Sequence, residues 1–177
     1  VESLLKFVGE DAQVENQVVN NHNKDTSPVE APLELRGTMK VNSLIERAGN
    51  DFLFKIGNVI GAQVEMYQED ERQNAVELDY PHKYLREITL LVPEGYELDG
   101  LDNLNMDIEY GDGREQTMGF KSTYEFQKGK LYVRVEEYYK RVNYPIGQFE
   151  EFRKVINAAA DFNKIVLVLR KASEQGG

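Results

Sequence analysis

Alternation of apolar and polar residues predicts short strands along most of the chain. Between residues 33 and 41, apolar side chains alternate with charged or hydroxyl-bearing ones, which is typical of a strand with one buried face. Two strand-like runs, 3–8 and 12–19, flank the turn-forming residues Gly9-Glu10-Asp11. The same pattern predicts further strands over 51–56, 62–67, 75–80 and 84–92.

Other local signals interrupt these strands. Ser43 and Glu46 have the spacing of a capping box, which predicts one helical turn over 43–48. The polar stretch 20–28 has no periodicity and is expected to be a long exposed loop. A stagger in the apolar pattern near Leu85 indicates a β-bulge in the strand over 84–92.

The clearest hairpin lies between residues 117 and 140. Its turn is Gln127-Lys128-Gly129-Lys130, in which Gly129 adopts a positive φ at little cost. One face of the two strands is predicted to be apolar, and Arg134 and Glu136 are predicted to face solvent. The apolar face comprises Met118, Phe120, Tyr124, Phe126, Leu131, Val133 and Val135.

One long helix is predicted from about Pro145 to Phe162, because apolar residues recur there at spacings of three and four. Asn163 is a candidate left-handed cap, and a buried strand is expected over 164–170. The sequence therefore predicts a mainly β fold, an antiparallel β-sandwich with one long α-helix, near the C-terminus, packed on it.

These elements suggest how the chain is organised. Residues 1–46 are expected to supply leading strands of the same module, 47–171 the main β-domain, and 172–177 a disordered tail. The chain has 177 residues, of which 41% are apolar, so one domain with a packed core is feasible.

The charge balance excludes some partners. The formal net charge is −10, so this acidic chain would repel a nucleic-acid backbone and an anionic lipid surface. No apolar run approaches the roughly 20 residues that a membrane helix needs. We therefore expect neither nucleic-acid binding nor a membrane span.

The residues available for catalysis are few. The chain contains no cysteine, which excludes a thiolate nucleophile, a thiolate metal site and a disulfide. His22 lies in the predicted loop, and His82 follows Pro81 in a predicted turn between strands. No Gly-x-Ser-x-Gly elbow is present. We predict no catalytic residue, no cofactor and no cofactor-binding residue, and expect that this chain alone is not an enzyme.

Oxygen-bearing side chains cluster in one acidic loop over 99–112. Their spacing does not fit the calcium loop of an EF-hand, so a solvated loop is favoured and no metal ligand is predicted. Calcium binding is the alternative for this loop. The residues concerned are Asp99, Asp102, Asn103, Asn105, Asp107 and Asp112.

Four tyrosines form a possible interaction surface: Tyr132, Tyr138, Tyr139 and Tyr144. They lie near the end of the predicted hairpin and the start of the helix. Exposed together, they would suit an interface hot spot. The favoured alternative is that they pack under the helix with their hydroxyl groups at the rim.

The order of elements from about residue 47 to 171 resembles a C-terminal β-domain of large exported bacterial proteins, catalogued as a domain of unknown function. The most telling element is a strand followed by Pro-x-Gly-Tyr, here Pro93 to Tyr96. The sequence departs from the family pattern after Arg72, where Gln73 replaces an early proline. Other resembling segments are Gly49–Phe54, Glu71-Arg72, Ala75–Tyr80, Ile88–Leu98, Phe149–Asn163 and Ile165–Lys171.

The resemblance implies a context for this chain. Such proteins, common in Gram-negative gut bacteria, carry an N-terminal β-sandwich and a central transglutaminase-like domain, which holds the catalytic Cys, His and Asp. The resemblance thus implies a periplasmic or cell-surface location and a transglutaminase-like domain as partner. It transfers no functional residue to this sequence.

Three functional hypotheses follow. The first is a non-catalytic accessory domain that scaffolds, or presents substrate to, a transglutaminase-like domain. The second is a carbohydrate- or peptide-binding β-sandwich module. The third is a carboxylate-based hydrolase, which requires two facing acids in a concave pocket, one with a raised pKa.

Overall fold

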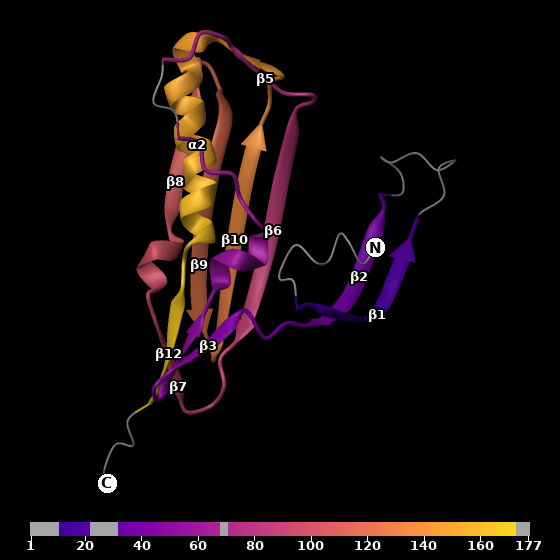
Figure 1. The fold of residues 1–177 in the computed structure, drawn as a ribbon, viewed down its shortest axis with the longest axis vertical. Coiled ribbons are helices and arrows are strands. Elements are labelled where there is room, and N and C mark those ends of the chain that lie inside the picture. The colour runs from indigo at the N-terminus through magenta and orange to yellow at the C-terminus, as the bar shows by residue number, and fades with distance from the viewer. Residues whose placement is uncertain (1–10, 22–31, 68–70, 173–177) are drawn as a thin grey trace.

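The protein is described by a computed structural model that covers residues 11–21, 32–67 and 71–172. Its largest unit is a four-stranded antiparallel sheet in the order β6-β10-β9-β8 (Figure 1). The strands are β6 (His82–Leu91), β8 (Met106–Gly111), β9 (Gln116–Gln127) and β10 (Lys130–Tyr139).

The β9–β10 hairpin confirms the predicted hairpin. Lys128 and Gly129 both have positive φ, 52° and 72°, as the two central residues of a type I′ turn require. From this turn, the ladder runs without a register shift from Gln127 opposite Lys130 to Met118 opposite Tyr139. The turn therefore determines which side chains of both strands share a face.

A second four-stranded sheet has the order β3-β4-β12-β7. The predicted helical turn over 43–48 is wrong, because Ile45–Ala48 pairs with Asp51–Phe54 around Gly49, whose φ is 68°. Ser43 donates its hydroxyl hydrogen to Asp11 and does not cap a helix. The strands are β3 (Ile45–Ala48), β4 (Asp51–Phe54), β7 (Tyr96–Asp99) and β12 (Leu167–Lys171).

The predicted helix is confirmed as α2 (Phe149–Asn163), which follows the 3₁₀ turn η4 (Ile146–Gln148). Asn163, however, is not a left-handed cap, since the C-cap is Lys164 with φ −85°. The Asn163 side chain donates instead to the carbonyls of Gly57 and Gly61, both at 2.9 Å. It thereby links the end of α2 to the 3₁₀ turn η2 (Ile56–Ile60).

The helix and the second sheet contribute to one hydrophobic core with the inner face of the large sheet (Figure 1). Phe162 of α2 packs against Phe120 with ring centroids 5.8 Å apart, and Phe152 packs against Tyr139 at 5.3 Å. Phe54 and Leu167 of the second sheet join the same core. The predicted fold class is therefore confirmed: mainly β, antiparallel, with one long helix packed on it.

Several strand predictions need correction. Residues 62–67 form no ladder; the side chain of Asn157 instead bonds the backbone N–H and C=O of Met66, at 2.7 and 3.2 Å. The predicted strand 75–80 shrinks to β5 (Val76–Glu77), which pairs with β11 (Asn143–Tyr144). No bulge occurs at Leu85, because the β6–β10 register is continuous. Within the large sheet, a register shift lies instead in β8, between Tyr110 and Gly111.

The first described strands, β1 (Gln13–Asn20) and β2 (Glu34–Lys40), confirm the strands predicted over 12–19 and 33–41. They form a hairpin that stands apart from the two larger sheets (Figure 1). The predicted strand 3–8, most of the loop 20–28 and residues 173–177 lie outside the described residues. That 1–46 belong to the same module stays a prediction.

The approach of η2 to α2 leads to a first prediction. A Cβ atom at Gly57 would lie 2.3 Å from the carbonyl oxygen of Phe162, so Gly57→Ala must separate the two backbones. We expect this overpacking to lower the free energy of unfolding by about 3 kcal/mol in urea denaturation. Gly147→Ala is the matched control, because nothing lies within 4 Å of its Cβ position. Equal stability of the two variants would contradict the close approach.

Candidate functional site

The outer face of the large sheet, opposite α2, contains the candidate site. An open groove of about 730 Å³ crosses β6, β10, β9 and β8 on this face. We call it the Tyr138 groove and define it by six of its lining residues: Lys83, Glu109, Gln116, Glu136, Tyr138 and Lys140. Pro81, His82 and Tyr139 line its end at the start of β6.

Gly119 allows Tyr138 to lie against the sheet. The two residues are directly opposite in the β9–β10 ladder. A Cβ atom at Gly119 would lie 2.9 Å from Cε1 and Cζ of the Tyr138 ring. The ring occupies this space, so Tyr138 is only 5% exposed although it is on the outer face. The aromatic ring of Tyr138 thus covers the part of the sheet surface that Gly119, which has no side chain, leaves bare.

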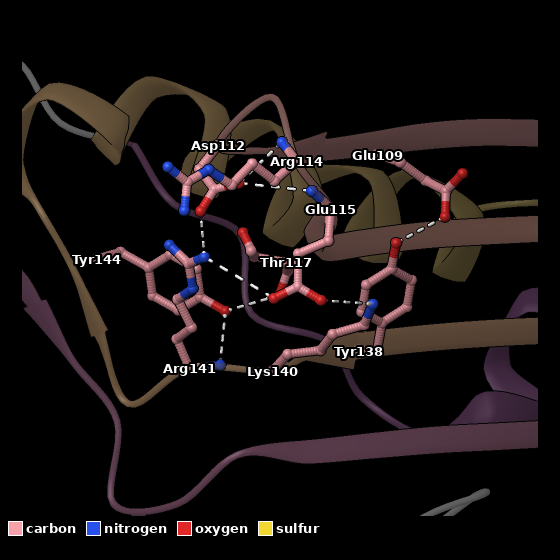
Figure 2. Close-up of polar contacts among 9 residues, drawn as sticks. All are labelled: Glu109, Asp112, Arg114, Glu115, Thr117, Tyr138, Lys140, Arg141 and Tyr144. Carbon is pink, nitrogen blue, oxygen red and sulfur yellow. Dashed lines mark hydrogen bonds and ion pairs between the residues drawn. The ribbon is translucent and has the colours of Figure 1, made fainter.

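The hydroxyl of Tyr138 donates a hydrogen bond to Glu109 Oε1 at 2.6 Å (Figure 2). Lys121 Nζ donates to Glu109 Oε2 at 2.9 Å. These two bonds lower the pKa of Glu109, because both stabilise the carboxylate. Burial, and then the bond to Glu109, raise the pKa of Tyr138. At neutral pH Glu109 is therefore ionised and Tyr138 neutral, and neither is suited to transfer a proton.

The cations around the groove are also paired. Lys83 lies 2.7 Å from Glu136, and the Lys140 ammonium lies 5.3 Å from the centroid of the Tyr138 ring. Lys140 also lies 4.0 Å from Glu115. Each charged side chain of the groove thus has a partner within the same protein. Charges of alternating sign around an aromatic ring form a surface suited to contact with a polar polypeptide.

A second polar cluster, formed by Asp112, Arg114, Glu115 and Arg141, holds the connection between β8 and β9 in place (Figure 2). Asp112 accepts hydrogen bonds from the backbone N–H groups of Arg114 and Glu115, at 3.0 and 3.4 Å. Its other oxygen accepts one from the Arg141 guanidinium at 2.5 Å. The Arg141 bond first, and the backbone bonds after it, lower the pKa of Asp112 to about 2. Residues 112–115 form the tight connection between β8 and β9.

Tyr144 lies buried behind this cluster. Its hydroxyl donates to the carbonyl of Thr117 at 3.0 Å and accepts from the backbone N–H of Arg141 at 3.3 Å. Its ring packs on Phe152 of α2. Tyr144 therefore connects the end of β10 to the start of β9 and to the helix, and it presents no surface to a ligand.

The structure does not bring the four predicted tyrosines together on an exposed surface. Tyr139 and Tyr144 are buried in the core, and Tyr138 is buried on the opposite face of β10. Tyr132 alone is exposed, at 41%, and lines a neighbouring outer-face groove of about 640 Å³ with Glu87 and Arg134. Adjacent strand residues point to opposite faces, so Tyr138 and Tyr139 are separated by the sheet itself.

His82 is part of an aromatic row. It is the first residue of β6, and its Nδ1 lies 3.0 Å from the carbonyl oxygen of Tyr80. Its ring centroid lies 5.2 Å from that of Tyr84 and 5.1 Å from that of Tyr139. This arrangement does not pair His82 with a serine and an acid. His22 lies outside the described residues.

The acidic loop expected over 99–112 is instead largely regular structure, because Leu101–Leu104 forms a 3₁₀ turn and Met106–Gly111 is strand β8. Its acids do not gather around one point. Asp99 pairs with Arg170 at 2.7 Å, Asp107 with Lys121 at 3.3 Å, and Asp112 with Arg141. Across the described parts of the chain, no three His, Asp or Glu side chains are grouped as a metal site requires. Over the same residues, no helix is both long and apolar enough to span a bilayer.

One ionic pair on the inner face was not predicted from the sequence. Glu137, whose side chain is 7% exposed, lies 3.2 Å from Arg86 and accepts a hydrogen bond from Tyr139 at 3.3 Å. Strand alternation from Val133 and Val135 places Glu137 on this face, so the sequence pattern did indicate that Glu137 would be buried. Gly119 was likewise detectable as a glycine inside a strand.

The sequence model of DUF3858, a domain of unknown function, matches residues 53–169, which is more than half of the chain. The match begins within β4 and ends within β12, so it includes both grooves. The comparisons with curated proteins and with solved structures return no match.

The Gly119–Tyr138 contact predicts a strong coupling between the two residues. We expect Gly119→Ala to lower the free energy of unfolding by about 2 kcal/mol, because the added methyl group displaces the Tyr138 ring. In a Tyr138→Ala background the same substitution should cost much less. A double-mutant cycle from urea denaturation measures the difference. Additive effects would contradict the contact.

The Asp112–Arg141 pair predicts a pH-dependent stability. The pKa of Asp112 is about 2 in the folded protein against an ordinary 3.8, so its stabilisation is present above 3.8 and is lost as pH falls toward 2. We expect Asp112→Asn to lower the melting temperature at neutral pH and to have progressively less effect across that window. The matched control is Asp102→Asn in η3 (Leu101–Leu104), where the acid is exposed. Identical pH profiles for both variants would rule out the pairing.

Proposed function

Because this chain belongs to the DUF3858 family, a domain of unknown function, we propose that it is a non-catalytic accessory domain of a larger protein. Its outer sheet face would hold or present a polypeptide to a transglutaminase-like domain of the same protein. The resemblance of residues 47–171 to the C-terminal domain of exported transglutaminase-like proteins supports that partner, together with an exported, periplasmic or cell-surface location.

One observation carries the proposal. The outer face of the large sheet is not covered by α2 or by the second sheet, and it contains two adjacent open grooves of about 730 and 640 Å³. Both are lined by residues of β6, β9 and β10. Glu136 of the first groove and Arg134 of the second lie two residues apart on β10, so the two grooves follow one another along the same strand, an arrangement that suits an extended chain better than a compact substrate.

The chemistry of the grooves supports holding rather than cleaving. Glu109 has a lowered pKa and two hydrogen-bond partners, whereas a general acid or base needs a pKa near the working pH. Tyr138 is buried and bonded to Glu109. The carboxylate-hydrolase hypothesis requires a raised carboxyl pKa, and Glu109 is shifted in the opposite direction.

A carbohydrate- or peptide-binding module remains the second candidate, and Tyr132 favours it. Its ring is exposed on the outer face beside Thr89, Thr123 and the Arg134–Glu87 pair. An exposed aromatic ring among hydrogen-bonding groups can stack on a sugar or a peptide side chain. This candidate requires no neighbouring catalytic domain.

The test uses the parent protein and the isolated chain. In the parent, we expect Tyr132→Ala to raise the KM for a protein substrate and to leave turnover of a small amide substrate unchanged, because only the long substrate reaches the groove. Phe126→Ala, at an exposed position on the inner face of β9, is the matched control.

Three other outcomes separate the hypotheses. Peptidase or transamidase turnover by the isolated chain would contradict a non-catalytic role. Binding of the isolated chain to oligosaccharides or peptides by calorimetry, lost in Tyr132→Ala, with an unchanged KM in the parent, would favour the second candidate. No effect of Tyr132→Ala in either assay would remove both binding hypotheses from this groove.

A further inference from the structure

Strand β6 has a free edge in the part of the chain that the structure describes. It lies at the margin of the large sheet, and β10 is its partner strand within the described residues (Figure 1). Val92 donates a backbone hydrogen bond to Gly129 at 2.9 Å, which places this opposed pair at a hydrogen-bonding position. Such positions alternate along an antiparallel ladder. The even-numbered residues of β6 therefore direct their backbone groups to β10, and the odd-numbered residues direct theirs to the free edge.

The free edge is long, and its outward side chains carry one charge of each sign, Lys83 and Glu87, and not a row of like charges. The backbone N–H and C=O groups that point to the free edge belong to residues whose side chains are exposed on the outer face. Strand β6 contains neither glycine nor proline, so this row of backbone groups is uninterrupted. A regular edge of this length is a template for another strand. Pro81, which lacks an N–H group, limits the ladder at one end. The outward residues are Lys83, Leu85, Glu87, Thr89 and Leu91.

We propose that β6 pairs antiparallel with β6 of a second copy, around a twofold axis that passes through Leu85. In this register Leu85, which is 47% exposed, lies opposite Leu85 of the partner subunit. Lys83 lies opposite Glu87 of the partner subunit, and the symmetry repeats this pair on the other side of the axis. The hydrogen-bonding positions centred on Leu85 supply about six intermolecular backbone bonds.

Charge complementarity selects this register. An axis through Glu87 would place two carboxylates opposite each other, and an axis through Lys83 would oppose two ammonium groups. The axis through Leu85 instead opposes unlike charges and joins two apolar side chains. Lys83 and Glu87 have side chains that are 53% and 69% exposed, so their pairs with Glu136 and Arg134 leave room for a second partner.

The inner-face residues of β6 are compatible with the same register. Tyr84 would lie opposite Arg86 of the partner subunit. Within one chain, the Arg86 guanidinium already lies 4.8 Å from the centroid of the Tyr84 ring, and Tyr84 is 45% exposed. The dimer would therefore extend a cation–π contact across the axis and join the two large sheets into one.

Disulfide trapping tests the register directly, because the chain has no cysteine. Two Leu85→Cys residues at the axis would have Cα atoms about 5.5 Å apart, within the range that a disulfide spans. We expect this variant to form a covalent dimer under mild oxidation. Leu91→Cys is the matched control: it is more exposed, at 65%, but its partner position lies beyond Pro81. It should remain monomeric under the same conditions.

Charge exchange provides an independent test by analytical ultracentrifugation. Lys83→Glu or Glu87→Lys alone should abolish the dimer, because each opposes like charges, and the double variant should restore it. These side chains are exposed, so the melting temperature should change little, which separates loss of dimer from loss of fold. A wild-type chain that is monomeric at every concentration would overturn the proposal. So would equal cross-linking at positions 85 and 91, or a double variant that stays monomeric.

Discussion

The β9–β10 ladder runs from its type I′ turn to Tyr139 without a register shift, and this continuity assigns every side chain of the two strands to one of two faces. Because strand side chains alternate, one face carries Leu131, Val133 and Val135 into the core, and the other carries Arg134 and Glu136 outward. A slip of one residue would exchange the two faces. The core, the grooves and the neighbouring strands β6 and β8 all depend on this register.

The two faces handle charge differently. Lys121 and Lys83 on the outer face, and Arg141 beside the β8–β9 connection, pair with acids that remain in contact with water, where such pairs contribute little stability but define a polar surface. On the inner face, Arg86 and Glu137 are paired away from most solvent. Removing one member of such a pair leaves a buried charge, which is far more costly than removing both. The inner pair therefore serves the stability of the fold, whereas the outer pairs lie where a binding partner can contact them.

Aromatic side chains lie where glycine or another aromatic residue gives them room. Tyr138 occupies the space above Gly119, and Tyr139 packs between His82 and Phe152. Both residues are buried, yet they lie on opposite sides of β10. Two tyrosines that are neighbours in the sequence therefore have different places in the structure: Tyr138 lines the groove and Tyr139 packs in the core.

Periodicity alone determined much of this fold. The β9–β10 hairpin, helix α2, the strands β1 and β2 and the mainly β class follow from local alternation, turn residues and helical spacing, because each depends on residues close in the sequence. The tertiary structure decided what distant residues do. Ser43 bonds Asp11 and so begins no helix, Asn157 replaces a partner strand for Met66, and Asn163 joins α2 to η2. The Tyr138 groove and the pairing of its charges also arise only when β8, β9 and β10 meet, because Glu109, Lys121 and Tyr138 are brought together by cross-strand register and not by proximity in the chain.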